Sequence, residues 1–310
     1  MKKLVRYFSI TTVIFLITVL VVGVFYFKTV YQSFSDNKDL PPVIIEFFAR
    51  LKKKEPAPIL KPEDTIRTLE GWTNSDIGLY FEENGRWPRK EFLEVAGFPQ
   101  IDYRNNKDLP AIPDFSLNYS FLADKPEYYG LEGYLFPDTY RIYASSTVTE
   151  VIEKMLANFD NKLTPKMRAD IASQGKTIYE IVTLASIVEK EAPLNYQSGS
   201  NREAKIIAGI FLNRLRIGQA LQSDATLSYI FSDNKPAHSG SELDVDSPYN
   251  TYKYRGLPPG PICNPGILAI EAAIYPIKTD YNYFLTTDAG EVAYARTYDE
   301  HLKNKYKYLK

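Results

Sequence analysis

An uncharged stretch of 21 residues near the N-terminus, Tyr7 to Phe27, limits most strongly what this chain can fold into. A helix of that length crosses a bilayer core of about 30 Å. Three basic residues lie within the first six positions and only Lys28 follows the stretch closely, which places the N-terminus in the cytoplasm by the positive-inside rule. We therefore expect a cytoplasmic tail over residues 1–6, a transmembrane helix over residues 7–27, and an extracytoplasmic remainder.

A cleaved signal peptide is the alternative interpretation of this stretch. The sequence "SFS", Ser33 to Ser35, is a weak small-residue cleavage site. The apolar core of a signal peptide is about 7–15 residues long, however, and the observed stretch is longer. An uncleaved anchor is therefore the favoured expectation, with the chain located at the cytoplasmic membrane as a single-pass protein.

The composition narrows the classes of function. A chain of 310 residues that is 45% hydrophobic can bury a sizeable core. Its formal net charge of −1 gives no reason to expect a nucleic-acid partner. With two histidines and one cysteine, Cys263, neither a disulfide within the chain nor a His/Cys zinc site is expected. No phosphate-binding glycine loop or dinucleotide fingerprint occurs, so no cofactor is expected either.

The chain after the anchor divides into a spacer and two units. Residues 28–62 form the spacer, because Leu51 to Pro62 is rich in charge and proline. Residues 63–128 begin with a short strand and continue with two helical segments, the second bounded by Pro88 and Gly97. This order is typical of a small binding module.

Residues 129–310 form the larger unit. Thr147 with Glu150, and Thr177 with Glu180, have the spacing of capping boxes that begin helices. Alternating residues on either side of 288–290 predict a β-hairpin, and a charged helix ends the chain. Because helices predominate and strands are few and local, the predicted fold class is α+β.

One acid stands within an apolar helix. In "SIVEKEA", Ser186 to Ala192, a rotation of about 100° per residue places Glu189 within the apolar stripe that contains Val182 and Ala185. Pro193 should end the helix near Glu191, so Glu189 lies in the last turn, where the helix dipole opposes a carboxylate. Burial acts in the same direction, so we expect a raised pKa, as a general acid requires. The alternative is a structural ion pair or a side chain that reaches solvent.

Six segments, in order, resemble one family. They are "EGYLFPDTY", "LASIVEKEA", "IAGIFLNRL", "LQSDAT", "DSPYNTYKYRGLPPGPICNPG" and "YPIKTDYNYFL", and they are distributed along most of the stretch from Leu131 to Leu302. In these segments the chain resembles the YceG-like (MltG-type) endolytic murein transglycosylases, and residues 63–128 resemble a reduced form of their LysM-like module.

The resemblance implies a membrane-anchored enzyme that acts on peptidoglycan glycan strands. It would cleave the β-1,4 bond between N-acetylmuramic acid and N-acetylglucosamine within a strand and leave 1,6-anhydromuramic ends, so that nascent strands are terminated or released. The catalytic glutamate of the family corresponds to Glu189, the residue that the helical pattern also selects. Peptidoglycan synthases of the elongation machinery are implied as partners.

The resemblance also suggests the residues that line the substrate cleft. Candidates for contact with substrate share short polar or tyrosine side chains within the matching segments: Gln222, Ser223, Asp224, Tyr249, Asn250, Tyr252 and Asn264. Glu132 and Asp138 are candidates for a supporting role behind the site. For all of these residues the alternative is ordinary loop hydrogen bonding or packing.

Two other functions stay open. A hydrolytic muramidase would need a positioned water and a second acid, for which Asp224 or Glu191 can be proposed. A non-catalytic envelope scaffold would bind glycan or division proteins and would not depend on the Glu189 carboxyl group.

Overall fold

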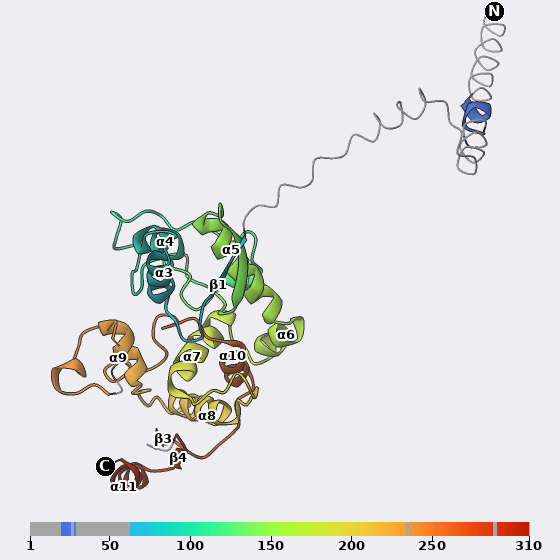
Figure 1. Cartoon of the computed structure of the whole chain (residues 1–310). Coiled ribbons are helices and arrows are strands. Elements are labelled where there is room, and N and C mark those ends of the chain that lie inside the picture. The colour runs from blue at the N-terminus through green and yellow to red at the C-terminus, as the bar shows by residue number, and fades with distance from the viewer. Residues whose placement is uncertain are drawn as a thin grey trace, which may run out of the picture. The chain divides into compact units, whose positions relative to one another are not determined.

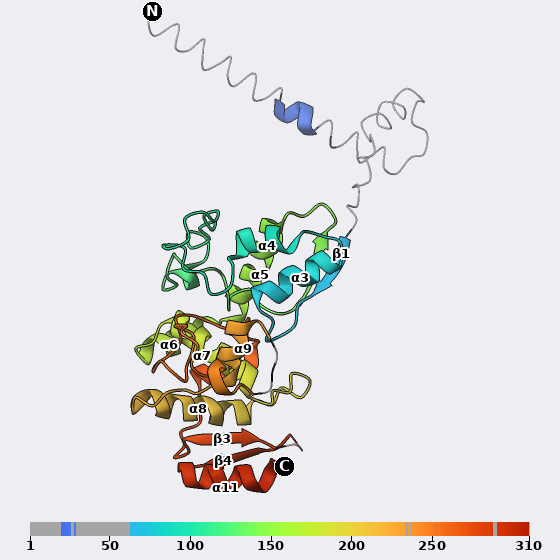
Figure 2. The ribbon, with the colours of Figure 1, turned by 90° about the vertical axis from the view of Figure 1, so that its left-hand side faces the viewer.

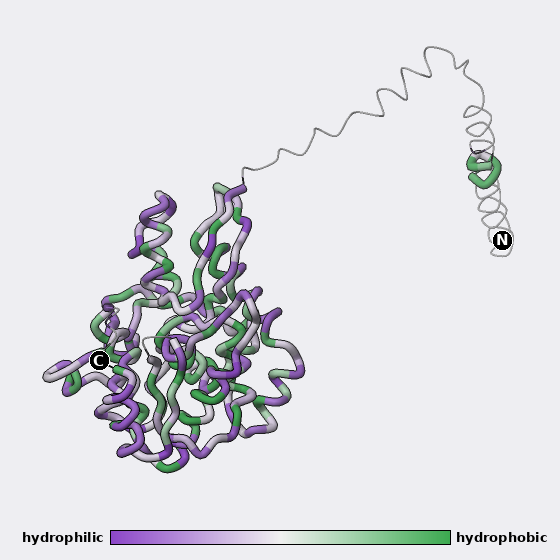
Figure 3. The backbone as a smooth tube through the Cα atoms, turned by 60° about the horizontal axis from the view of Figure 1, so that its bottom comes forward, coloured by the Kyte–Doolittle hydropathy of each residue, from purple (hydrophilic) through white to green (hydrophobic). Residues whose placement is uncertain are grey.

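The computed structural model describes residues 20–25, 28, 63–233, 235, 237–287 and 290–309. The predicted cytoplasmic tail and nearly all of the spacer lie outside these residues, as does most of the predicted transmembrane helix. Residues 20–25 are helical and apolar (Figure 3). Within the described part of the chain, no helix has both the length and the apolar character needed to cross a membrane.

The rest of the described chain, from Glu63 onward, belongs to one compact unit (Figure 1). The helices, short 3-10 helices and strands follow one another as β1 (Glu63–Arg67), α3 (Asn74–Glu83), α4 (Arg89–Ala96), η1 (Ser120–Leu122), β2 (Thr139–Tyr143), α5 (Val148–Lys162), α6 (Pro165–Ser173), α7 (Ile178–Glu191), α8 (Arg202–Arg216), α9 (Asp224–Phe231), η2 (Gly240–Glu242), α10 (Ile267–Ile274), β3 (Tyr283–Thr286), β4 (Val292–Ala295) and α11 (Tyr298–Tyr308). The mixture of helices with small sheets confirms the predicted α+β class.

Two antiparallel pairs make up the described sheets. β3 pairs with β4, which confirms the predicted hairpin, and α11 packs against both strands. β1 pairs with β2 in a register that joins Ile66 to Tyr140. This second pairing crosses the position at which the sequence divides into two units, so the first strand of the predicted small module shares its sheet with the larger unit.

α7 lies at the centre of the unit, where α6, α8, α9 and α10 all contact it (Figures 1 and 2). Every residue from Ile181 to Val188 is buried. Its N-terminus carries the predicted capping box, in which the Thr177 hydroxyl accepts from the Glu180 N–H and the Glu180 carboxylate accepts from the Thr177 N–H. A helix buried on all sides holds its end residues in a fixed position, which matters for the acid at its C-terminus.

Candidate active site

Glu189 lies in the last turn of α7, as predicted. The helix ends at Glu191, and Ala192 takes an extended conformation (φ −97°, ψ 141°) before Pro193. The chain then turns back, so that Tyr196 reaches the end of the helix that it follows. There its hydroxyl donates a hydrogen bond of 2.5 Å to Glu189 Oε2.

A second donor to Glu189 comes from the N-terminus of α10. The backbone N–H of Gly266, the residue that precedes α10, donates to Glu189 Oε2 over 3.0 Å. Both of these hydrogen bonds end on the same oxygen. The other oxygen, Oε1, is therefore the one available to carry a proton toward a substrate.

Gly266 occupies a position that a side chain cannot share. A Cβ atom there would lie 2.4 Å from the Tyr196 hydroxyl oxygen and 2.7 Å from Cγ of Glu70. Its φ of −82° is open to any residue, so the need for glycine is a matter of space and not of backbone conformation. Glu70, in the turn after β1, thus lies against the same glycine that donates to Glu189.

The surroundings of Glu189 raise its pKa to about 7 from an ordinary value of 4.5. Burial is the main cause, because it disfavours the charged carboxylate. The hydrogen bonds from Tyr196 and Gly266 and the charge of Lys190 act in the opposite direction, and the negative charge of Glu70 raises the pKa further. A carboxyl group that titrates near neutral pH is suited to general acid and general base catalysis.

Tyr196 itself stays neutral. Burial and the neighbouring Glu189 raise the pKa of its hydroxyl well above the ordinary value of 10. It therefore remains a hydrogen-bond donor to Glu189 throughout the physiological pH range. This donor stabilises the carboxylate that forms once Glu189 has given up its proton.

Three of the predicted substrate-contact residues come together around Glu191. The Ser223 hydroxyl donates to Glu191 Oε1 over 2.5 Å. Asp224 accepts hydrogen bonds from the Tyr252 hydroxyl and from the His238 backbone N–H, the latter over 3.1 Å. Burial raises the pKa of Glu191, and the charge of Asp224 adds to that shift. Glu191 is thus engaged with this polar cluster, while Glu189 is held by different partners.

Gln222 differs from the other residues of its motif. It adopts a left-handed conformation (φ 49°), which is uncommon for a residue other than glycine, and its side chain is exposed. Its backbone N–H donates to the Thr251 carbonyl over 3.0 Å. Strained backbone of this kind is concentrated at functional sites, and the exposed amide of Gln222 is free to meet a ligand.

Tyr249 and Asn250 are buried and contact protein groups. The Asn250 amide donates to the carbonyls of Leu243 and Val245, and its oxygen accepts from backbone N–H groups, including that of Tyr252. The Tyr249 ring packs on Tyr229 with centroids 5.1 Å apart. In the described structure both residues hold the loop that carries Tyr252.

Asn264 lies at the centre of a buried polar network. Its oxygen accepts from the backbone N–H groups of Gly133 and Leu135, at 3.0 and 2.9 Å. Its amide donates to the Trp72 carbonyl, to the Asn74 side chain and to Glu132 Oε1. Asn264 therefore ties the start of α3 to the "EGYLFPDTY" segment.

Glu132 belongs to the same network. It is 8% exposed and accepts from the backbone N–H of Asn74 over 3.0 Å. Burial raises its pKa to about 8, so it is mostly protonated at neutral pH. Asp138, by contrast, accepts from Asn158 and forms an ion pair with Lys162 at 3.5 Å, so it joins β2 to α5.

Three residues at the site have no counterpart among the sequence-based candidates: Tyr196, Gly266 and Glu70. The only local signal was the position of Tyr196 shortly after the proline that ends α7. Gly266 and Glu70 are brought to Glu189 by contacts between distant parts of the chain. Cys263 is buried and its thiol contacts the Ser186 carbonyl at 3.3 Å, consistent with a packing role.

Comparisons with known proteins give one consistent result. Residues 43–307 match the YceG-like family. A Bacillus subtilis protein named endolytic murein transglycosylase is 38% identical over 244 residues, which are 79% of this chain and 65% of that protein. A Streptococcus pneumoniae protein of the same name is 38% identical over 191 residues, which are 59% of this chain and 33% of that protein.

A solved structure is similar as well. The crystal structure of a yceG-like protein from Listeria monocytogenes superposes with a TM-score of 0.64 at 33% sequence identity, covering 78% of this chain and 76% of that chain. The chain thus spans just under two thirds of the Bacillus relative's length and one third of the Streptococcus relative's length.

Proposed function

The chain belongs to the YceG-like family, and we propose that it is an endolytic murein transglycosylase with Glu189 as its catalytic residue. The observation that carries the proposal is the state of Glu189. One of its oxygens is held by two donors, its pKa is about 7, and it lies at the fixed end of a buried helix. The names of the Bacillus and Streptococcus relatives support peptidoglycan as the substrate.

The proposed reaction needs only one carboxyl group. Protonated Glu189 gives its proton from Oε1 to the glycosidic oxygen between N-acetylmuramic acid and N-acetylglucosamine, and the bond from that oxygen to muramic C1 breaks. The C6 hydroxyl of the same muramic residue attacks C1 and forms the 1,6-anhydro ring. The proton of that hydroxyl passes to the Glu189 carboxylate, which restores the starting state.

The hydrogen bonds at Oε2 fit this cycle. The negative charge that develops when Glu189 releases its proton is shared with Tyr196 and the Gly266 N–H, both already in place. Preorganised donors of this kind stabilise the charged state without reorganisation during the reaction. Gln222, with its exposed side chain, and the cluster of Ser223, Asp224 and Tyr252 are proposed to contact the glycan.

Mass spectrometry of digested glycan strands tests the proposal. We expect wild-type chain to release fragments with anhydromuramic ends and the Glu189→Gln variant to release none, while the variant keeps its circular dichroism spectrum. Normal anhydro yield from the variant would refute the assignment of Glu189. If Glu189→Gln also restored every growth phenotype of a deletion strain, a scaffold function would be favoured instead.

Hydrolysis is a second candidate function, and the position of Glu70 favours it. A muramidase needs a second carboxylate to activate water or to stabilise the intermediate. Glu70 lies against Gly266, the residue whose N–H donates to Glu189. Glu191 and Asp224 are instead engaged in the polar cluster with Ser223 and Tyr252. The same mass spectra separate the two reactions, because hydrolysis leaves reducing ends of ordinary mass.

We further propose that residues 7–27 anchor the chain in the cytoplasmic membrane with the N-terminus inside. Apolar side chains within the part of this stretch that the structure describes are highly exposed, from 58% at Val21 to 73% at Phe25, as for a segment that faces lipid. Protease added to intact protoplasts should then digest residues 63–310 and leave an N-terminal tag protected. Partnership with elongation synthases is proposed from the resemblance, and photo-crosslinking from the spacer, residues 28–62, tests it.

A further inference from the structure

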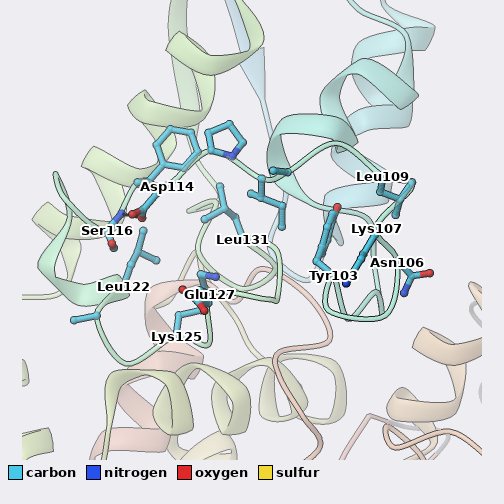
Figure 4. Close-up of a pocket in the computed structure, with 15 residues that line it drawn as sticks. Tyr103, Asn106, Lys107, Leu109, Asp114, Ser116, Leu122, Lys125, Glu127 and Leu131 are labelled. Carbon is cyan, nitrogen blue, oxygen red and sulfur yellow. Dashed lines mark hydrogen bonds between the residues drawn. The ribbon is translucent and has the colours of Figure 1, made fainter.

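A cavity of about 720 Å³ lies in the segment between α4 and β2, and Glu189 is not among its lining residues (Figure 4). The segment contains only one short 3-10 helix, η1, across more than forty residues. Long connections of this kind inside a compact unit are uncommon and usually have a function. The volume is within the range of pockets that take small organic ligands or short peptides.

Lys125 is the most distinctive group in this cavity. Its ammonium donates to the carbonyls of Pro126 and Tyr129, over 2.9 and 2.5 Å. An ammonium has three N–H donors, so one is left for a ligand. Burial lowers the pKa of Lys125 to about 8, although the charges of Asp114 and Glu127 act to raise it. An anion placed beside Lys125 would offset the loss of solvation.

The walls offer both signs of charge. In Figure 4, Asp114 and Ser116 lie on one wall and Tyr103, Asn106 and Lys107 on the opposite wall. Leu131 lies between the two walls, and Lys125 and Glu127 lie below it. Asp114 is held as a carboxylate, because the Ser116 side chain and backbone lower its pKa. Lysine ammonium groups form charge-assisted hydrogen bonds with carboxylates, and acidic side chains form them with amines. The cavity therefore matches a ligand that carries both groups near an apolar surface.

We infer that this cavity binds the peptide stem of the peptidoglycan strand, a short peptide with free carboxylates and an amino group. The inference rests on the proposed function for the choice of this particular peptide. That the ligand carries both a carboxylate and an amine is inferred from the cavity alone. The cavity wall is also connected to the proposed active site: Leu131 lines the cavity, and its neighbour Glu132 accepts from Asn264, two residues before the Gly266 that donates to Glu189. Stem recognition would direct cleavage to strands that still carry peptides.

Two assays test the inference. In the first, the tetrapeptide L-Ala-γ-D-Glu-L-Lys-D-Ala is titrated into the full chain and binding is measured by calorimetry. In the second, cleavage rates are compared on glycan strands with and without their stems, the latter prepared with an amidase. We expect the tetrapeptide to bind and the wild-type chain to prefer stem-bearing strands about ten-fold, as one charge-assisted contact would give.

Substitutions at the cavity locate the effect. Lys125→Gln should reduce both the stem preference and tetrapeptide affinity about ten-fold. Lys107→Gln, on an exposed residue of the opposite wall, should also reduce the stem preference and the tetrapeptide affinity. It replaces Lys125→Gln as the test if that variant fails to fold. Lys90→Gln, on the exposed face of α4 outside the cavity, is the control and should change neither.

The outcomes are distinguishable. Equal rates on both substrates together with no tetrapeptide binding would overturn the inference and leave the proposed function intact. Tetrapeptide binding that the two lysine substitutions do not alter would overturn the assignment to this cavity. Tetrapeptide binding that Lys125→Gln weakens, with no cleavage of either substrate, would support the cavity and refute the proposed function.

Discussion

Glu70 and Glu189, two carboxyl groups far apart in the chain, meet at a single glycine. The backbone N–H of Gly266 donates to Glu189, and the Glu70 side chain fills the space where a Gly266 side chain would be. Glu70 is also one of the causes that raise the pKa of Glu189. The turn after β1 therefore influences the chemistry at the end of α7.

The first prediction concerns Glu70. Replacing it with glutamine removes a negative charge beside Glu189, so the pKa of Glu189 should fall below its present value of about 7. Because protonated Glu189 is required, the alkaline limb of the pH–rate profile should move to lower pH. At acidic pH, where Glu189 is protonated, the variant should still be active. Rates measured from pH 5 to 9 check this.

The matched control for Glu70→Gln is Glu83→Gln, an exposed residue on α3. It should leave the profile in place. If Glu70→Gln instead abolished turnover at every pH, Glu70 would be acting in the reaction itself, as the hydrolytic mechanism requires.

The second prediction concerns Tyr196. Tyr196→Phe removes the 2.5 Å hydrogen bond to Glu189, a contact that favours the carboxylate. The alkaline limb should therefore move to higher pH, opposite to the effect of Glu70→Gln. Because the carboxylate formed after proton transfer also loses a charge-assisted donor, the maximum rate should fall roughly 10- to 100-fold. An unchanged maximum rate would contradict the role assigned to Tyr196.

The third prediction links the pKa of Glu189 to stability. A folded-state pKa of about 7 above an unfolded value near 4.5 means that the folded chain binds this proton more tightly. The free energy of unfolding therefore falls as pH rises from about 4.5 to 7, by roughly 3 kcal/mol in total, and stays lower above pH 7. The Glu189→Gln variant has no ionisable group at this position, so its free energy of unfolding should not show this fall.

Urea unfolding measures the effect of Glu189→Gln. The variant should be more stable than wild type by up to roughly 3 kcal/mol at pH 8, and the difference should vanish near pH 4. A variant less stable than wild type at pH 8 would show that the ionised Glu189 carboxylate does not destabilise the folded chain at that pH.

The fourth prediction concerns space at Gly266. Alanine there would place Cβ 2.4 Å from the Tyr196 hydroxyl oxygen and displace a donor of Glu189. We expect about a 100-fold loss of activity, comparable with the contribution of general acid catalysis. Adding Tyr196→Phe removes the nearest of the three clashing atoms and a donor that Gly266→Ala already displaces, so the double variant should lose less than the product of the two single losses. Multiplicative losses would show that the two residues act independently.

The sequence predicted the features that local chemistry decides. α7 begins at a capping box and ends before Pro193, both readable from neighbouring residues. Its helical period singled out Glu189, and the buried end of the helix raises the pKa in the direction expected. Neighbouring residues fix the bounds of the helix and the face that carries Glu189, whereas the burial that raises the pKa is supplied by the elements packed against that face.

Contacts between distant segments could not be predicted in this way. The pairing of β1 with β2 and the approach of Glu70 and Gly266 to Glu189 depend on how separate elements pack. Asn250 was selected for its polar side chain, yet that side chain is buried and bonded to protein carbonyls. Composition shows which residues can bind a ligand, but packing decides whether their polar atoms remain available.

The fifth prediction concerns Asn264, which joins segments that the sequence assigns to different units. Asn264→Ala leaves the buried N–H groups of Gly133 and Leu135 without their acceptor. Each unsatisfied buried group costs about 1–3 kcal/mol, so the free energy of unfolding should fall by roughly 3 kcal/mol or more.

Asn264→Asp is the matched variant, because it keeps the acceptor oxygen but loses the amide donor to Trp72. It also places a charge near Glu132, which is mostly protonated at pH 7 because its pKa is about 8. The destabilisation by aspartate should therefore grow as pH rises from 5 to 8, whereas that of alanine should not. Urea unfolding at both pH values separates the two, and a pH-independent effect of aspartate would show that Glu132 and residue 264 are not coupled.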